Sequence, residues 1–221
     1  MRVVIVGAGS VGRSIARELL DNSHQVLLID KDSKAVTVDA IPQAEWLLAD
    51  ACEIASLAEA GLADCDVVVA ATGDDKVNLV VSLLAKTEYG VPRTVARVNN
   101  PKNEWMFDEA WGVDVAVSTP RLMTALVEEA VSVGDLVRIF TFQRGQATMV
   151  ELTLPEDSPL AGTTVGEISW PPDTVLVGII RGDRPIAPGV DDALEGADEL
   201  MLLTVPERED ALQRLLSPPR A

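Results

Sequence analysis

The sequence predicts an α/β protein, with a Rossmann-like doubly wound parallel sheet followed by a small α+β C-terminal domain. Over the first 120 residues, short apolar runs alternate with segments of helical periodicity. The runs are nearly continuous in Val, Ile, Leu and Ala, which is typical of parallel strands buried on both faces. Ten of the 13 prolines lie beyond residue 119, where short strands and turns take over. We therefore predict a Rossmann-like domain over residues 1–135 and a smaller domain over residues 136–221.

Each element of the first domain follows from its local pattern. Unbroken apolar runs predict strands at residues 2–6, 25–29, 45–49, 66–71, 93–98 and 113–117. Apolar residues that recur every three or four positions predict helices at residues 10–21, 53–60, 75–89 and 120–133. Pro120 suits the first turn of the last of these helices.

The second domain has shorter and less regular signals. Apolar and β-branched runs predict strands at residues 149–154, 174–180 and 200–205. We expect a short helix at Val165–Ile168, a turn over residues 181–185 and a closing helix over residues 207–216.

Charge and composition exclude several classes of partner. The chain has 35 acidic and 18 basic residues, a formal net charge of -17. Nucleic acids and anionic lipid surfaces are therefore poor partners. No apolar stretch reaches the roughly 18 residues of a membrane span, so we expect no direct membrane insertion. Two cysteines and a start without signal-peptide features predict a cytoplasmic protein.

The strongest motif follows the first predicted strand and opens the first helix. Residues Gly7–Gly12 read Gly-Ala-Gly-Ser-Val-Gly, the spacing of a dinucleotide-binding loop. In such loops Gly7 permits the tight turn, Gly9 lets the main chain approach a pyrophosphate, and Gly12 lets the helix pack closely on the strand. The helix start then offers free N–H groups to phosphate.

An acidic residue ends the second strand. Asp30 is placed to accept hydrogen bonds from ribose hydroxyls and to repel a 2′-phosphate, which favours NAD(H), ADP or ATP over NADP. Lys31 directly follows and would tolerate an extra phosphate. The alternative is that Asp30 is a plain turn residue.

Further candidates lie where later strands end, because ligands of open parallel sheets bind at the carboxyl ends of the strands. Asp50 is placed to meet the adenine edge, and Thr72 and Gly73 to pass beneath ribose and phosphate; Ala51 and Ala71 adjoin them at the same strand ends. Asp74 and Asp75 are equally well explained as helix N-caps. Arg97, at the end of the fifth strand, would pair with a phosphate or, alternatively, with the surrounding carboxylates.

Catalytic groups are scarce. The single histidine, His24, precedes the second strand and lies away from the strand ends, and Cys52 and Cys65 have no histidine partner. Neither the cysteines nor His24 have metal-ligand spacing. We predict no catalytic residue, no metal site and no enzymatic activity.

These motifs together resemble the regulatory subunits of Trk-type bacterial potassium uptake systems, over nearly the whole chain. The first half contributes Gly7–Gly12, Asp30, Asp50-Ala51, Ala71–Asp75, Asn78 and Ala96–Asn99. The second half contributes Leu160–Ile168, Val175–Arg181, Pro188 and Leu194–Leu200.

The resemblance implies domains that regulate potassium conductance, in which NAD(H) or an adenine nucleotide shifts a cytosolic assembly. That assembly would gate a membrane-embedded potassium transporter subunit, at the inner face of the cell membrane. The implied ligand-binding residues are Gly7, Ala8, Gly9, Ser10, Val11, Gly12, Asp30, Lys31, Asp50, Ala51, Ala71, Thr72, Gly73 and Arg97. In some relatives a glutamate follows the proline that corresponds to Pro120, and it holds a metal ion. This chain has Arg121 at that position.

Assembly and two alternative functions complete the predictions. Many relatives contain two copies of the unit and this chain contains one, so a homo-oligomer (dimer or tetramer) or a similar regulatory partner is implied. The apolar stripe of the helix at 120–133 is a candidate subunit contact, or it packs on its own sheet. The alternatives are an NAD-dependent oxidoreductase, supported by fold analogy alone, and a free-standing sensor of a small ligand.

Overall fold

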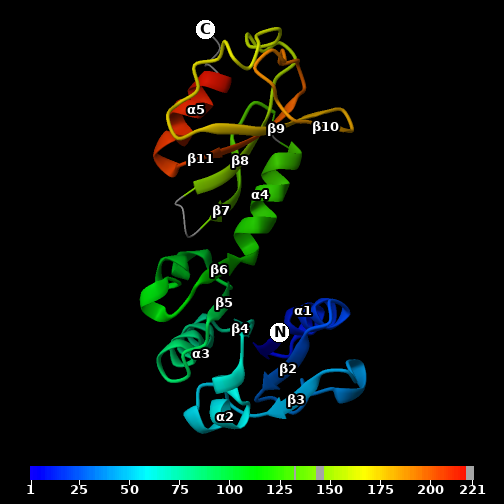
Figure 1. Ribbon diagram of the computed structural model, residues 1–221, viewed down its shortest axis with the longest axis vertical. Coiled ribbons are helices and arrows are strands. Elements are labelled where there is room, and N and C mark those ends of the chain that lie inside the picture. Colours follow the sequence, from blue (N-terminus) through cyan, green and yellow to red (C-terminus); the bar gives the residue numbers. More distant parts are fainter. Residues whose placement is uncertain (132, 143–146, 218–221) are drawn as a thin grey trace. The chain divides into compact units, whose positions relative to one another are not determined.

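A computed structural model describes residues 1–131, 133–142 and 147–217 (Figure 1). The chain divides into two compact units, Met1–Pro120 and Arg121–Ala221, and each is considered by itself. The domain boundary that the sequence predicts after residue 135 stays a prediction. The division between the two compact units falls earlier, after Pro120. Residue 132 of the predicted helix, and residues 143–146 and 218–221 of the predicted second domain, lie outside the described residues.

The first unit contains a six-stranded parallel sheet in the order β3-β2-β1-β4-β5-β6. Its strands are β1 (Arg2–Val6), β2 (Gln25–Asp30), β3 (Glu45–Leu48), β4 (Val67–Ala70), β5 (Arg93–Val98) and β6 (Val115–Ser118). The chain order reverses beside β1, which pairs with both β2 and β4. The predicted doubly wound parallel sheet is confirmed, and its switch point lies at β1.

Helices cover both faces of this sheet, as an all-parallel sheet requires. The covering helices are α1 (Ser10–Asp21), α2 (Ile54–Glu59) and α3 (Asp75–Thr87). The helix α4 (Thr119–Val131) follows β6 and runs on into the second unit. On one face Ile5 and Leu28 are fully buried with Ala16 of α1. On the other face Val4 packs in one cluster with Leu57 of α2 and Val81 of α3.

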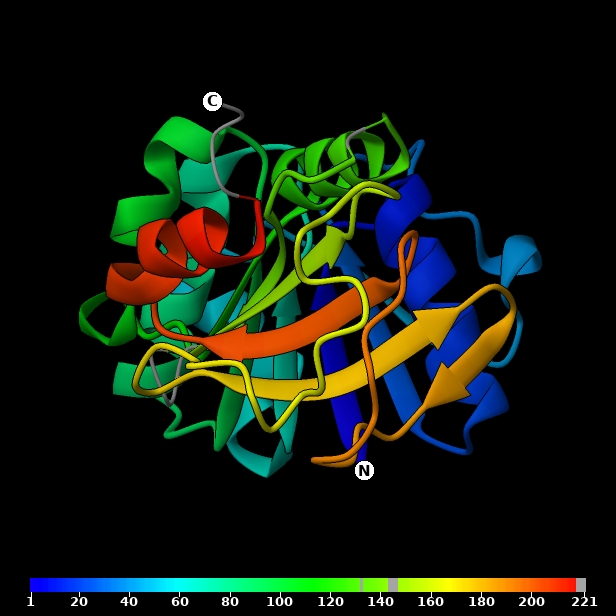
Figure 2. The ribbon, with the colours of Figure 1, turned by 90° about the horizontal axis from the view of Figure 1, so that it is seen from above.

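The second unit is built on a five-stranded antiparallel sheet in the order β10-β9-β11-β8-β7. Its elements are β7 (Val137–Phe142), β8 (Ala147–Thr153), β9 (Val175–Arg181), β10 (Arg184–Ile186), β11 (Glu199–Thr204) and α5 (Glu209–Leu216). Figure 2 shows β9 and β10 as a hairpin and α5 beside β11. Leu212 and Leu216 of α5 are buried against Leu202 of β11, so the predicted α+β domain is confirmed.

One prediction for the second unit is wrong, and another gives a turn that is too long. Val165–Ile168 does not form a helix, because its amides bond to a distant segment. The amide N–H of Val165 donates to the carbonyl of Asp192 at 2.9 Å, and that of Gly166 to the carbonyl of Val190 at 2.9 Å. The predicted turn over residues 181–185 is shorter, since β10 begins at Arg184. The strand β7 was not predicted.

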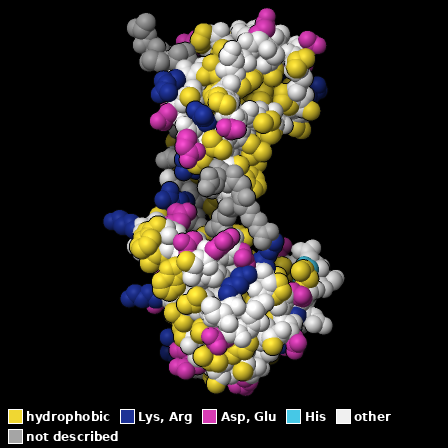
Figure 3. All heavy atoms as spheres, turned by 60° about the vertical axis from the view of Figure 1, so that its left-hand side comes forward, with side chains coloured by type: hydrophobic (Ala, Val, Ile, Leu, Met, Phe, Trp, Pro, Cys, Tyr) yellow, Lys and Arg dark blue, Asp and Glu magenta, His cyan; other side chains and the backbone are white. Residues whose placement is uncertain are grey.

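The acidic excess is spread over the surface. On the face shown in Figure 3, Asp and Glu side chains are scattered over both units among apolar ones. In the part of the chain that the structure describes, no helix combines the length and apolar character needed to cross a membrane.

Candidate functional site

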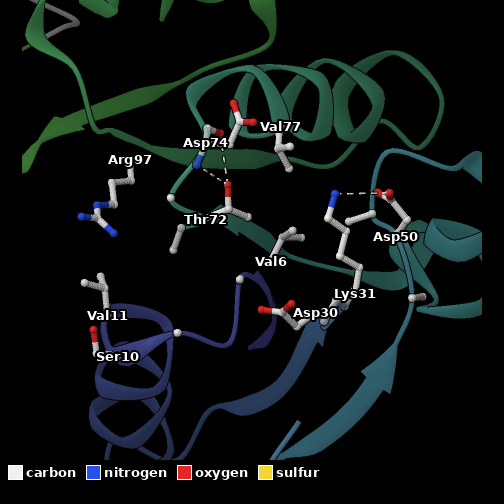
Figure 4. A pocket seen from close by; sticks show the side chains of 17 residues that line it. Val6, Ser10, Val11, Asp30, Lys31, Asp50, Thr72, Asp74, Val77 and Arg97 are labelled. Atoms are coloured by element: carbon white, nitrogen blue, oxygen red, sulfur yellow. Dashed lines mark hydrogen bonds and ion pairs between the residues drawn. The ribbon is translucent and has the colours of Figure 1, made fainter. Parts of the chain in front are cut away.

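A cavity of about 480 Å³ lies at the carboxyl ends of the strands, beside the switch point of the sheet (Figure 4). Its size falls within the range of small-molecule sites. It brings together every predicted ligand-binding residue except Ala8 and Gly12. Those that line it are Gly7, Gly9, Ser10, Val11, Asp30, Lys31, Asp50, Ala51, Ala71, Thr72, Gly73 and Arg97.

The glycine loop has the close packing that its spacing predicts. Gly7 has a φ of +104°, and a Cβ there would lie 2.8 Å from the main-chain N of Thr72. A Cβ on Gly12 would lie 1.8 Å from the Gly7 carbonyl oxygen, so Gly12 packs on the loop and not against the cavity. A Cβ on Gly9 would meet no heavy atom within 4 Å. Gly9 therefore borders open space where an anion has room.

The N-terminus of α1 opens toward this space. No side chain caps it, so its first N–H groups and the positive end of the helix dipole are available to an anion. Ala8 is held beneath the loop: its N–H donates to Asp30 Oδ2 at 2.8 Å, and its carbonyl accepts from Arg13 Nη1 at 2.8 Å. These bonds, together with its complete burial, explain why Ala8 does not line the cavity.

Asp30 both orders the loop and faces the cavity. Its other oxygen, Oδ1, accepts from the N–H of Asp32 at 2.9 Å. A carboxylate has about four acceptor positions, so lone pairs remain for a ligand hydroxyl. At the same end of the cavity Lys31 Nζ lies 3.8 Å from Asp50 Oδ2. Both side chains are well exposed, so this pair contributes little to stability.

Arg97 offers a cation on the opposite side of the cavity. In Figure 4 its guanidinium faces Ser10 and Val11, away from Asp30 and Asp50. Its Nε atom is buried without a hydrogen-bond partner, and no carboxylate among the described residues forms an ion pair with it. The alternative prediction, a salt bridge to surrounding acid, is not found within residues 1–131, 133–142 and 147–217. The charge of Arg97 is thus available to an anionic ligand.

Sequence reasoning missed five lining residues: Val6, Ile29, Ala49, Asp74 and Val77. Val6, Ile29 and Ala49 lie at or just beyond strand ends, so the position alone would have indicated them. Asp74 caps α3, because its Oδ1 accepts from the N–H of Lys76 at 2.9 Å. The capping alternative is therefore confirmed for Asp74.

Asp75 plays a different part from a cap. Its buried carboxylate accepts the main-chain N–H of Asn99 at 2.7 Å and of Asn100 at 3.0 Å, and the Nδ2 groups of Asn99 and Asn103. Burial by itself raises the pKa of Asp75, but these hydrogen bonds outweigh it and hold the pKa below its ordinary value. The ionised carboxylate thus anchors the segment that follows β5.

The thiols are not activated. Burial raises the pKa of Cys65, and burial together with the charge of Asp50 raises that of Cys52. Both thiols therefore stay protonated near neutral pH, where a thiolate would be needed for nucleophilic attack. Within the described residues no group of three or more His, Cys, Asp or Glu side chains is arranged to hold a metal ion.

Comparisons with known proteins cover both units. Family models of the TrkA-N domain and the TrkA-C domain match residues 3–119 and 149–217. The chain is 56% identical over 218 residues to the Trk system potassium uptake protein TrkA of Mycobacterium tuberculosis (strain ATCC 25618 / H37Rv), with 99% of each chain covered.

Solved structures with the same fold hold nucleotides. The GsuK channel bound to NAD aligns with a TM-score of 0.68 at 18% identity, over 99% of this chain and 40% of that chain. GsuK bound to ADP aligns with a TM-score of 0.53 at 15% identity, over 61% of this chain and 35% of that chain. At these identities the likeness concerns the fold alone.

Proposed function

The chain belongs to the TrkA family of Trk potassium uptake proteins, and from this premise we propose that it is a nucleotide-binding regulatory subunit that gates a potassium transporter. The observation that carries the proposal is the cavity at the sheet's switch point. An uncapped helix start and Arg97 lie on one side, and Asp30 with Asp50 on the other. This separation of charge suits a ligand with phosphates at one end and a nucleoside at the other.

We place the ligand across the cavity, from the positively charged side to the acidic side. The phosphates lie between the start of α1 and Arg97. They accept from the N–H groups of Ser10 and Val11 and face the guanidinium of Arg97. The ribose hydroxyls bond to the free lone pairs of Asp30, and the adenine lies near Asp50 and Ala51. NAD(H), ADP and ATP share the adenosine and the phosphates that this arrangement recognises, and relatives of this fold are bound to NAD and ADP.

We infer that the ligand is bound and not transformed. Each carboxylate that lines the cavity accepts a main-chain N–H: Asp30 from Ala8 and Asp32, Asp50 from Cys52, and Asp74 from Lys76. These bonds commit part of each carboxylate to holding the main chain. The guanidinium at the phosphate end has only hydrogen-bond donors and no acceptor position. These features favour a regulatory site over that of an oxidoreductase.

We propose that the partner is a membrane-embedded potassium transporter subunit, reached from the cytoplasmic side. The net charge of -17 disfavours contact with anionic lipid. It suits the basic cytoplasmic loops that membrane proteins carry, so docking would be protein to protein. Gating then requires that the ligand bind two conformations of the assembly with different affinity.

We propose that α4 is the subunit contact. Met123, Leu126 and Val127 are 64%, 57% and 59% exposed, so the stripe is not covered by its own unit. A second copy would remove this apolar surface from water.

A Leu126→Asp variant is expected to shift the assembly to monomers, because the new charge would be buried at the contact. Size-exclusion chromatography with light scattering measures the change. Val190→Asp, which places the same charge at an apolar residue that is 69% exposed in a loop, is the matched control and should leave the mass unchanged. A Leu126→Asp protein with the mass of the wild type would exclude α4 as the contact.

The proposed function is tested by calorimetric titration of the purified protein with NADH, ADP and ATP. We expect saturable binding of at least one of them; dissociation constants all weaker than about 1 mM would overturn the proposal. Co-purification with a membrane potassium transporter separates a gating subunit from a free-standing sensor. Consumption of NADH with a carbonyl substrate would instead indicate an oxidoreductase.

A further inference from the structure

Asn78, the fourth residue of α3, does not line the cavity but joins two of its walls. Its side chain is completely buried. Its Oδ1 accepts from the main-chain N–H of Thr72 at 3.0 Å and from Thr72 Oγ1 at 2.6 Å. Its Nδ2 donates to the carbonyl of Thr72 at 3.2 Å and to that of Arg97 at 2.8 Å. One carboxamide thus links the loop after β4 to the end of β5.

The chemistry of these partners fixes the orientation of the carboxamide. The main-chain N–H of Thr72 can only donate, and the carbonyl of Arg97 can only accept. A rotated amide would place donor against donor and acceptor against acceptor. Asn78 uses two accepting and two donating positions, which is its full capacity for hydrogen bonds. No other residue type of this size offers two accepting and two donating positions on one side chain.

A second amide reinforces the same point of the loop. Asn99 Nδ2 donates to the carbonyl of Thr72 at 3.0 Å and to Asp75 Oδ1 at 3.0 Å. The Thr72 carbonyl therefore accepts from both Asn78 and Asn99, and Asp75 holds Asn99 in place. The loop residue that faces the ligand cavity is tied through all of its main-chain polar groups.

We propose that Asn78 is a positioning residue for nucleotide binding. It holds the Thr72-Gly73 loop and the main chain of Arg97 at a fixed separation, so that the guanidinium meets a phosphate lying over the loop. The inference rests on the proposed function, since it needs a phosphate-bearing ligand in this cavity. Fixing both walls in advance spares the ligand the cost of ordering them.

A double-mutant cycle with ADP as the probe tests this role. Asn78→Ala leaves the polar groups of Thr72 and the carbonyl of Arg97 without this partner, and we expect ADP to bind about tenfold more weakly. In an Arg97→Gln background the same change should weaken binding by less than about threefold, because the group that Asn78 positions is already gone. A purely structural residue would cause the same loss in both backgrounds.

Thr94→Val is the matched control at the other end of β5. Thr94 is fully buried, and its hydroxyl donates to the carbonyl of Gly112 and accepts from the N–H of Asp114, far from the cavity. It should lower thermal stability but leave ADP affinity unchanged. If Asn78→Ala does not fold, Asn99→Ala, which weakens the same anchor from a half-buried position, replaces it in the cycle.

The outcomes separate this inference from the proposed function. Wild-type protein that does not bind ADP, NADH or ATP would overturn both. Wild-type binding of ADP, together with equal losses in the two backgrounds or no loss at all, would overturn the positioning role alone. A loss that depends on Arg97 supports it.

Discussion

A Gly9→Asp variant is expected to bind ADP and NADH at least about a hundredfold more weakly while it keeps its fold. Gly9 is the N-cap of α1, with a φ of −67° that any residue adopts, and a Cβ there meets no heavy atom within 4 Å. Aspartate is a favoured N-cap, so the helix should be at least as stable as before. The new carboxylate would occupy the free N–H groups and repel the phosphates that we place there.

The decisive feature of this experiment is that binding and stability should move apart. Calorimetric titration gives the affinity, and thermal unfolding gives the stability of the same sample. Gly178→Asp is the control: it adds the same side chain on β9, in the second unit, where the nearest heavy atom to the new Cβ is Met201 Cβ at 3.9 Å. A Gly9→Asp protein that binds ADP as tightly as the wild type would place the nucleotide elsewhere.

The two halves of the chain differ in how well local pattern predicts structure. The predicted helix over residues 10–21 has the bounds of α1, because its apolar face, loop and following strand all give local signals. The helix predicted at Val165–Ile168 does not exist, since the amides of Val165 and Gly166 donate to the carbonyls of Asp192 and Val190. Such bonds between distant segments leave no periodic trace in the sequence.

The same distinction applies within the site. The glycine loop, Asp30 and Arg97 were predictable because the carboxyl ends of parallel strands meet at one edge of a sheet. Ala8 was expected in the cavity, but its N–H and carbonyl are both used beneath the loop. Asn78 is among the residues that carry the family resemblance, but its linking role depends on partners 6 and 19 residues away, which no local pattern indicates.

In the second unit, Arg181→Met is expected to lower the free energy of unfolding by about 3 kcal/mol. Arg181 Nε and Nη2 each lie 2.8 Å from an oxygen of Asp198, whose side chain is completely buried. Nη1 also contacts Glu195 at 2.6 Å, and Nη2 donates to the carbonyl of Ala193. The hydrogen bonds with Asp198 raise the pKa of Arg181 above its ordinary value.

The size of this effect follows from what the substitution leaves behind. Methionine replaces the stem of Arg181 but not its charge, so the Asp198 carboxylate stays buried, with the N–H of Glu195 still donating to it. An uncompensated buried charge is far more costly than the loss of an exposed pair. Arg184→Met, at an exposed position on β10, removes the same charge and should change stability by less than about 0.5 kcal/mol.

Urea unfolding, followed by the fluorescence of Trp170 in a variant that lacks the other tryptophans, measures the stability of this unit. Trp170 is a suitable reporter because it packs against the core of the second unit and its Nε1 donates to the carbonyl of Val165. ADP affinity in the folded protein should be unaffected, because every residue that lines the cavity at the switch point belongs to the first unit. Equal stabilities of Arg181→Met and Arg184→Met would show that Asp198 does not need its partner.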